Sequence, residues 1–275
     1  MTSDALARAP ADTPTATEID RCTHPEGDDS AEGCPARHAV LPLPAGLPAS
    51  PVDGLSYRLW TGAEPTAQAC LRHPFVQGMA TGELPRLAFQ HYLGQDFVYL
   101  KSFAKAYELT LPKCQTGEVR DAVASFIDGV NKELMLHEGY AASWGVSMDS
   151  VTAAPATTAY TDFLLEVASC PNMGVDHVFA AMAPCARLYG YLACQLARAY
   201  VGRWEASPYA RWIRSYSADE YLALPALQEQ LLDRMAGRVA EAELQRLYDR
   251  AMDLELGFFE AASACLLLPA LKAVA

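Results

Sequence analysis

Apolar residues recur about every 3.6 positions along most of the chain after Leu55, which is typical of amphipathic α-helices. Turn signals interrupt this pattern only at short intervals, so the sequence predicts an all-α domain. The predicted helices cover residues 57–72, 85–111, 117–144, 157–168, 175–199, 208–235 and 240–267. We expect the 208–235 helix to break near Ser217 or Pro225, and we expect Gly82 and Gly145 to end helices.

The first 53 residues lack this period and are rich in Pro, Ala, Gly and acidic residues. They are predicted to form a disordered or loosely attached acidic leader, followed by one catalytic domain over residues 54–275. The leader resembles neither a secretory signal nor an organellar transit peptide. Its Cys22, His24, Cys34 and His38 lack the flanking pattern of a zinc site. We therefore expect no metal there.

The amino-acid composition and net charge limit the kinds of partner that the protein can bind. The chain has 275 residues, 51% of them hydrophobic, and a net charge of -12, which disfavours a nucleic-acid surface because phosphate binding needs clustered Lys and Arg. No apolar run reaches the roughly 20 residues of a membrane span. Eight cysteines in a chain of this length indicate free thiols in a reducing compartment. We expect a cytoplasmic protein with a small-molecule partner and no contact with nucleic acid or membrane.

Reactive and aromatic residues gather in two distant segments, residues 84–100 and 183–189. Asp96 and Tyr99 are spaced i, i+3, and Cys185 and Tyr189 are spaced i, i+4, so each pair shares one helix face. The pattern indicates a pocket and favours a cysteine hydrolase. A single cysteine on an apolar helix is, however, more often a core residue than a nucleophile. The sequence by itself identifies no base that would activate it.

Further polar groups lie among apolar helix residues. Tyr160, Tyr216 and Glu255 join Asp96 as candidates, because a carboxylate that is buried between aromatic residues is costly unless it is paired. A different interpretation is a di-iron site built on Glu133 and His137 with late carboxylates. The repeated Glu-x-x-His motif of such sites is absent from the sequence. Glycine-rich nucleotide loops and the Gly-x-Ser-x-Gly elbow are absent as well.

The order of motifs resembles the TenA family, also called thiaminase II or aminopyrimidine aminohydrolase. The matching segments are 73–77, 82–85, Phe89, 92–93, 95–96, 99–100, 133–137, 159–160, 183–185 with Tyr189, 212–213 with Tyr216, and Glu255. They extend over residues 57–267 and omit the leader. Because Cys185 stands where one branch of the family keeps its nucleophile, the chain resembles the cysteine-bearing branch.

This resemblance implies a haem-oxygenase-like helical bundle without metal or organic cofactor, commonly a homotetramer. It also implies a role in thiamin salvage. The expected reaction converts 4-amino-5-aminomethyl-2-methylpyrimidine to the hydroxymethylpyrimidine and ammonia, with possible cleavage of thiamin. The competing interpretations are a di-iron oxidase of the same fold and a pyrimidine-binding regulatory protein without turnover.

The resemblance also assigns roles to residues. Cys185 would add to C6 of the pyrimidine, and Glu255 would transfer protons to the leaving amine. Asp96 would hold the ring by a hydrogen bond. The remaining candidates would complete an aromatic pocket, and they are Tyr99, Tyr160, Tyr189 and Tyr216.

Overall fold

The computed structural model describes residues 53–264, except for the side chains of residues 136–138 and 149. All regular structure in this range is helical, so the all-α prediction is confirmed. Apart from Asp53, the predicted leader lies outside the described residues, as do its Cys22, His24, Cys34 and His38. None of the described helices combines the length and apolarity that a bilayer crossing requires.

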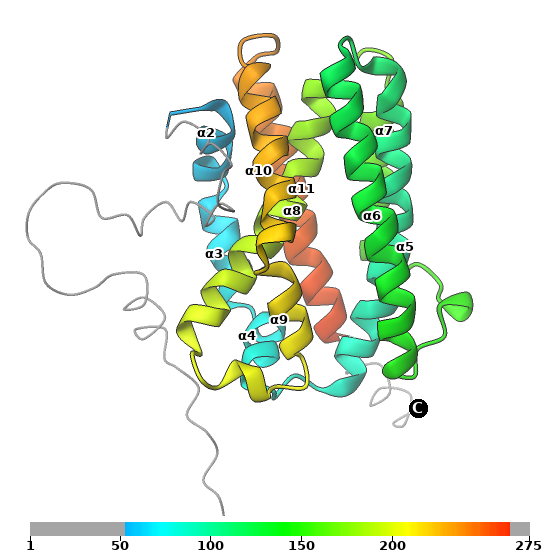
Figure 1. The fold of residues 1–275 in the computed structure, drawn as a ribbon, viewed down its shortest axis with the longest axis vertical. Coiled ribbons are helices and arrows are strands. Elements are labelled where there is room, and N and C mark those ends of the chain that lie inside the picture. Colours follow the sequence, from blue (N-terminus) through cyan, green and yellow to red (C-terminus); the bar gives the residue numbers. More distant parts are fainter. Residues whose placement is uncertain (1–52, 265–275) are drawn as a thin grey trace, which may run out of the picture. The chain divides into compact units, whose positions relative to one another are not determined.

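Short helices precede the long ones along the chain (Figure 1). They are α2 (Leu55–Gly62), α3 (Glu64–Arg72) and α4 (Pro74–Thr81). The helices that follow are α5 (Arg86–Thr110), α6 (Gly117–Ser143), α7 (Pro155–Ser169), α8 (Val175–Ala199), α9 (Ala210–Tyr216), α10 (Asp219–Arg234) and α11 (Glu241–Ala264). Single 3₁₀ turns are η1 (Leu111–Lys113), η2 (Met148–Ser150) and η3 (Trp204–Ala206).

The beginning of the domain differs from the prediction. The single helix expected over residues 57–72 is wrong, because Ala63 separates α2 from α3. A further helix, α4, follows directly and was not predicted as a separate element. Its N-terminus is capped by His73, whose Nδ1 accepts a hydrogen bond from the Phe75 amide at 3.2 Å, and Pro74 fits the first helical position because it needs no N–H partner there.

The expected helix over residues 208–235 is also two helices. The break falls at Ser217, between α9 and α10, which is the first of the two predicted positions. Pro225 instead lies inside α10. Gly82 and Gly145 follow helix ends with φ values of 79° and 75°, so both predictions of helix ends are confirmed. Residues 265–267 of the last predicted helix lie outside the described range.

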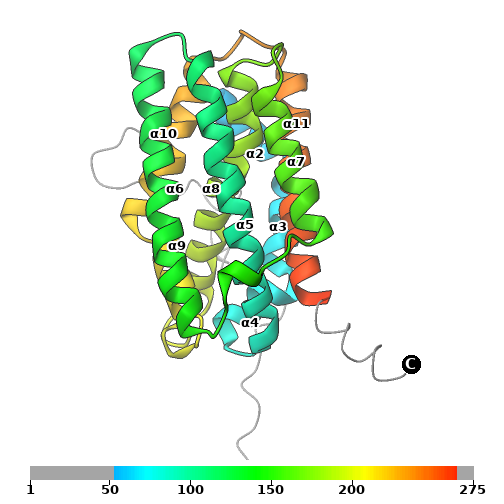
Figure 2. The ribbon, with the colours of Figure 1, turned by 90° about the vertical axis from the view of Figure 1, so that its right-hand side faces the viewer.

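Helix α8 forms the core of the domain. It packs against α10 and α11, while α5 packs against α6 and α7, and Figure 2 shows α5, α6 and α7 on one side of the bundle. Most of α8 is buried, including Ala180, Ala181 and Ala183. These small side chains let neighbouring helices approach closely, since interhelical distance follows side-chain size. The arrangement surrounds Cys185 with side chains from several helices.

Candidate active site

A cavity lies between α5, α6, α8, α9 and α10. It contains five of the seven predicted site residues, which are Asp96, Tyr99, Cys185, Tyr189 and Tyr216. The other lining residues are Leu100, Phe103, Tyr107, Phe126, Gly129, Val130, Glu133, Ala186, Tyr221, Leu224 and Gln228. The lining is mainly aromatic and aliphatic with a few polar groups, which is the usual chemistry of a small-molecule site.

Glu255 and Tyr160 stand behind this lining and are connected to it. The Tyr160 hydroxyl of α7 donates a hydrogen bond to Oε1 of Glu255 on α11 at 2.8 Å. Burial raises the pKa of Glu255 to about 7, although hydrogen bonds from Tyr160 and Cys185 act in the opposite direction. A carboxyl group with a pKa near neutrality suits proton transfer in either direction. The structure therefore brings Glu255 next to the cavity cysteine.

Cys185 follows Pro184 in the middle of α8 and is half-buried. Burial raises the pKa of its thiol well above the ordinary value, and the negative charge of Glu255 raises it further. The nearby Tyr99 hydroxyl lowers the pKa of the thiol, but this effect is smaller than the effects of burial and of Glu255. The sulfur is consequently a thiol at neutral pH. Any nucleophilic role requires a base beside it, and Glu255 occupies that position.

Two more carboxyl groups face the same space. The pKa of Asp96 is raised well above its ordinary value by burial and then by the charges of Glu133 and Glu255. Burial also raises the pKa of Glu133, whose Oε1 accepts a hydrogen bond from Tyr216 at 2.7 Å. Carboxyl groups that share a buried site cannot all ionise easily. A protonated carboxyl group here can donate a hydrogen bond to a ligand as well as accept one.

Aromatic rings fix the walls of the cavity. The ring centroids of Tyr99 and Tyr160 are 4.7 Å apart, and those of Tyr189 and Tyr216 are 5.0 Å apart in an edge-to-face arrangement. Tyr189 also contacts Trp212, with centroids 5.6 Å apart. Such ring pairs restrict side-chain movement and suit a flat aromatic ligand.

Several lining residues were missed as pocket residues in the sequence. Phe103 and Tyr107 continue the α5 face of Asp96 and Tyr99, so helical spacing was a usable signal for them. Tyr221 and Gln228 come from α10, and no local pattern connects them to Cys185. The Tyr221 hydroxyl donates to the Ala186 carbonyl oxygen at 3.2 Å, which ties α10 to the turn of α8 that carries the cysteine.

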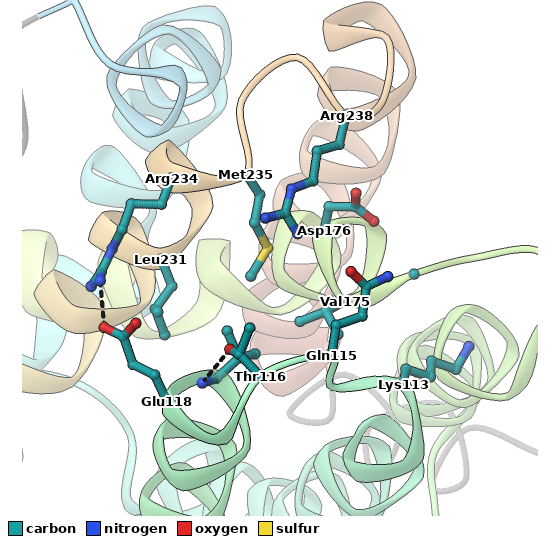
Figure 3. Close-up of a pocket in the computed structure, with 12 residues that line it drawn as sticks. Lys113, Gln115, Thr116, Glu118, Val175, Asp176, Leu231, Arg234, Met235 and Arg238 are labelled. Atoms are coloured by element: carbon teal, nitrogen blue, oxygen red, sulfur yellow. Dashed lines mark hydrogen bonds and ion pairs between the residues drawn. The ribbon is translucent and has the colours of Figure 1, made fainter.

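Two of the other cavities among the described residues have different linings. One opens beside the site and shares Gly129, Glu133, Tyr216, Tyr221 and Leu224 with it. The other lies where the α5–α6, α7–α8 and α10–α11 connections meet (Figure 3). Its lining includes Lys113, Asp176 and Arg238, with an ion pair between Arg234 and Glu118. It contains none of the seven predicted site residues.

The geometry of the described residues also bears on the di-iron interpretation. No three His, Cys, Asp or Glu side chains between residues 53 and 264, among those whose side chains are described, form a group that could hold a metal ion. Glu133 instead hydrogen-bonds to Tyr216. The side chain of His137, the predicted histidine ligand, lies outside the described set.

The helical bundle and its aromatic, carboxyl-rich cavity define a class of protein with a haem-oxygenase-like fold. A solved domain from Shewanella denitrificans, described as having a heme oxygenase-like fold, superimposes with a TM-score of 0.61 at 14% identity, over 79% of this chain and 95% of that one. A solved protein from Silicibacter, described as a TenA family transcription regulator, superimposes with a TM-score of 0.70 at 29% identity, over 76% of this chain and 96% of that one. The fold prediction is confirmed.

The family is shown by sequence. Residues 60–265 match the model of the TENA/THI-4/PQQC family, and the chain belongs to that family. An aminopyrimidine aminohydrolase from Halalkalibacterium halodurans is 29% identical over 74% of this chain and 93% of its own length. The mitochondrial bifunctional TH2 protein of Arabidopsis thaliana is 29% identical over 78% of this chain, and the match spans 38% of the plant protein.

Proposed function

We propose that this protein is an aminopyrimidine aminohydrolase of thiamin metabolism. Its substrate would be 4-amino-5-aminomethyl-2-methylpyrimidine, which it hydrolyses to the hydroxymethylpyrimidine and ammonia. Thiamin would be a second substrate with a thiazolium leaving group. The observation that carries the proposal is the convergence of Cys185 and Glu255 beside a cavity with aromatic walls. Membership of the family and the similarity to the Halalkalibacterium enzyme support it.

The first step activates the thiol. Glu255, with a pKa of about 7, is partly ionised at neutral pH and accepts the proton of Cys185. The sulfur then bonds to C6 of the pyrimidine, and the electron pair of the C6–N1 double bond moves to N1. The addition ends the aromatic stabilisation of the ring, so the exocyclic bond becomes easier to break. Nucleophilic catalysis in this way divides one difficult displacement into easier steps.

The second step expels the amine. The 4-amino nitrogen of the pyrimidine pushes its electron pair toward C5, the bond to the leaving nitrogen breaks, and Glu255 returns its proton to that nitrogen. Water adds to the exocyclic methylene and gives a proton to Glu255, and the sulfur leaves and takes up that proton as the ring becomes aromatic again. Positioned proton transfer of this kind contributes roughly 10² to 10⁴ in rate.

The remaining site residues orient the substrate. Asp96 hydrogen-bonds the amino edge of the pyrimidine, and its raised pKa allows the carboxyl group to donate as well as accept. Tyr99 and Tyr189 form aromatic walls, Tyr160 holds Glu255, and Tyr216 borders the cysteine from α9. By resemblance to the family, the assembly would be a homotetramer.

Ammonia release from the aminomethylpyrimidine tests the proposal, with thiamin assayed in parallel. We expect turnover by the wild type and background rates for Cys185→Ala and Cys185→Ser. Cys194→Ala is the matched control, because Cys194 is a buried cysteine on the same helix outside the cavity lining. Activity retained by Cys185→Ser would remove the covalent step. Absence of wild-type turnover on both substrates would remove the proposed function.

A further inference from the structure

A larger cavity adjoins the cavity beside Cys185, and the mechanism above does not use it. Its volume is about 370 Å³, whereas the volume of the cysteine cavity is about 50 Å³. Any substrate that is much larger than the pyrimidine itself must therefore extend beyond the cysteine cavity. The larger cavity has aromatic and aliphatic walls with exposed polar side chains around them, including Leu93, Tyr140, Trp212, Lys132 and Glu220.

The boundary between the two cavities lies close to the sulfur. Tyr216 and Tyr221 line both cavities, and their rings meet edge to face with centroids 4.8 Å apart. The Tyr221 hydroxyl donates a hydrogen bond at 3.2 Å to the carbonyl oxygen of Ala186, the residue after Cys185. In the proposed reaction the sulfur bonds to C6, and the exocyclic methylene is attached to the neighbouring carbon, C5. The leaving group therefore begins next to this boundary.

Gly129 lies in this boundary, at a position where the fold does not require glycine. It lines both cavities from the interior of the 27-residue helix α6, where glycine is less stable than alanine. It is not among the glycines with positive φ, so the backbone conformation suits any residue. A Cβ atom added to Gly129 would lie 3.5 Å from Cδ1 of Leu224 on α10. This is an ordinary contact distance, so close helix packing does not require glycine either.

The missing side chain of Gly129 leaves space between α6 and α10. Leu224 also lines both cavities, and a methyl group at position 129 would fill the space in front of its two methyl carbons, at 3.5 and 3.8 Å. Another part of the boundary is occupied by the hydrogen bond that Tyr216 donates to Oε1 of Glu133 at 2.7 Å. Glycine at position 129 therefore provides the room for a ligand to cross from one cavity into the other.

From these observations, and resting on the proposed function, we infer that Gly129 is a specificity-determining residue that lets the leaving group extend from the cysteine cavity into the adjoining cavity. The aromatic and aliphatic walls there suit a leaving group that carries one aromatic ring. The protein then hydrolyses aminomethylpyrimidines whose amine nitrogen bears such a ring. Water supplies the hydroxyl group of the hydroxymethylpyrimidine and one hydrogen of the released amine.

The test compares two substrates on the full-length protein and its variants. The substrates are 4-amino-5-aminomethyl-2-methylpyrimidine and its N-benzyl derivative, and chromatography measures the hydroxymethylpyrimidine that both yield. Gly129→Ala and Gly129→Leu put a small and a large side chain into the space between α6 and α10. Gly139→Ala and Gly139→Leu are the matched controls, because Gly139 is exposed on the same helix and a Cβ atom added there meets no other part of the structure within 4 Å.

We expect the ratio of kcat/KM for the N-benzyl substrate to kcat/KM for the unsubstituted one to be the same in the wild type and in both Gly139 variants. Gly129→Ala should lower this ratio by about tenfold, because a ligand in an overpacked space binds more weakly, and Gly129→Leu should lower it further. Both alanine variants should melt at a higher temperature than the wild type, which separates the loss from unfolding. An unchanged ratio in Gly129→Leu would overturn the inference.

The wild type alone separates failure of this inference from failure of the proposed function. A wild type that hydrolyses the unsubstituted substrate but not the N-benzyl derivative would overturn the inferred path of the leaving group and leave the proposed function intact. A wild type that hydrolyses neither of these substrates, nor thiamin, would overturn the proposed function and, with it, this inference.

Discussion

Glu255 is held between two groups that affect its protonation in the same direction. Tyr160 and Cys185 both hydrogen-bond to it and lower its pKa, whereas burial raises the pKa to about 7. Because the carboxyl group is 2% exposed, the balance depends on individual hydrogen bonds rather than on solvent. A change of one of these partners should therefore appear directly in the pH dependence of the reaction.

For Tyr160→Phe we expect the rising limb of kcat/KM against pH to move to higher pH by about one unit. The wild-type rate should rise through pH 7, because Glu255 must be ionised to accept the thiol proton. Loss of the 2.8 Å hydrogen bond from Tyr160 favours the protonated carboxyl group and raises its pKa. The steady-state pH profile measures this. Tyr191→Phe, a buried tyrosine outside the cavity lining, should leave the limb in place, and an equal shift in both variants would contradict the assignment.

At the level of elements, one side chain of α5 fastens the start of α7. Oε1 of Gln95 accepts hydrogen bonds from the Ala154 amide at 2.7 Å and from Thr157 Oγ1 at 2.6 Å. Its Nε2 donates to the Thr152 carbonyl oxygen at 3.0 Å. Since α7 carries Tyr160, this buried amide helps to place the hydroxyl that contacts Glu255.

We expect Gln95→Leu to lower the free energy of unfolding by about 2 to 3 kcal/mol, because three hydrogen bonds are lost and their partners are left buried. Denaturant unfolding measures the change. Gln90→Leu is the control on the same helix, since Gln90 Nε2 donates to the Trp144 carbonyl oxygen at 2.5 Å, and its loss should cost about 1 kcal/mol. The two variants should differ clearly, and equal costs would show that Gln95 does not fasten α7.

On the scale of the whole molecule, the buried carboxyl groups make stability depend on pH. Burial raises the pKa values of Asp96, Glu133, Glu229 and Glu255. The folded protein therefore keeps protons that the unfolded chain releases above about pH 4.3. The contribution of Glu255 to stability is consequently complete below that pH and is lost as the pH rises toward its folded pKa of about 7.

Glu255→Gln should remove this dependence. Relative to the wild type, the variant should become increasingly stable as the pH rises from 4.5 to 7. Denaturation at several pH values measures this difference in the free energy of unfolding. Glu241→Gln should change stability with pH in the opposite direction, because the ion pair with Arg58 lowers the pKa of the exposed Glu241. The contribution of Glu241 to stability is present at neutral pH and is lost as the pH falls, so this variant should be less stable than the wild type at neutral pH and approach it in acid. A flat difference for Glu255→Gln would show that its pKa is not raised.

Helical spacing in the sequence was sufficient for the all-α class, for the long helices and for the shared faces of Asp96 with Tyr99 and of Cys185 with Tyr189. These features are local, because the 3.6-residue period of a helix decides which neighbours meet. The order of motifs is likewise a property of the sequence, and it predicted the family that the match over residues 60–265 shows. The division of residues 57–72 at Ala63 escaped the prediction, since one apolar period continues across two helices that pack differently.

Tertiary structure alone decided which side chains meet across the bundle. Tyr160 donates a hydrogen bond to Glu255, and Tyr216 donates one to Glu133, over large sequence separations, and no local pattern specifies such contacts. The pKa values depended on the fold in the same way. The sequence contains the carboxyl group of Glu255, but burial between helices removes it from water and raises its pKa to about 7. Desolvation is a property of the packed interior, so the chemistry of this carboxyl group could be known only once its neighbours were in place.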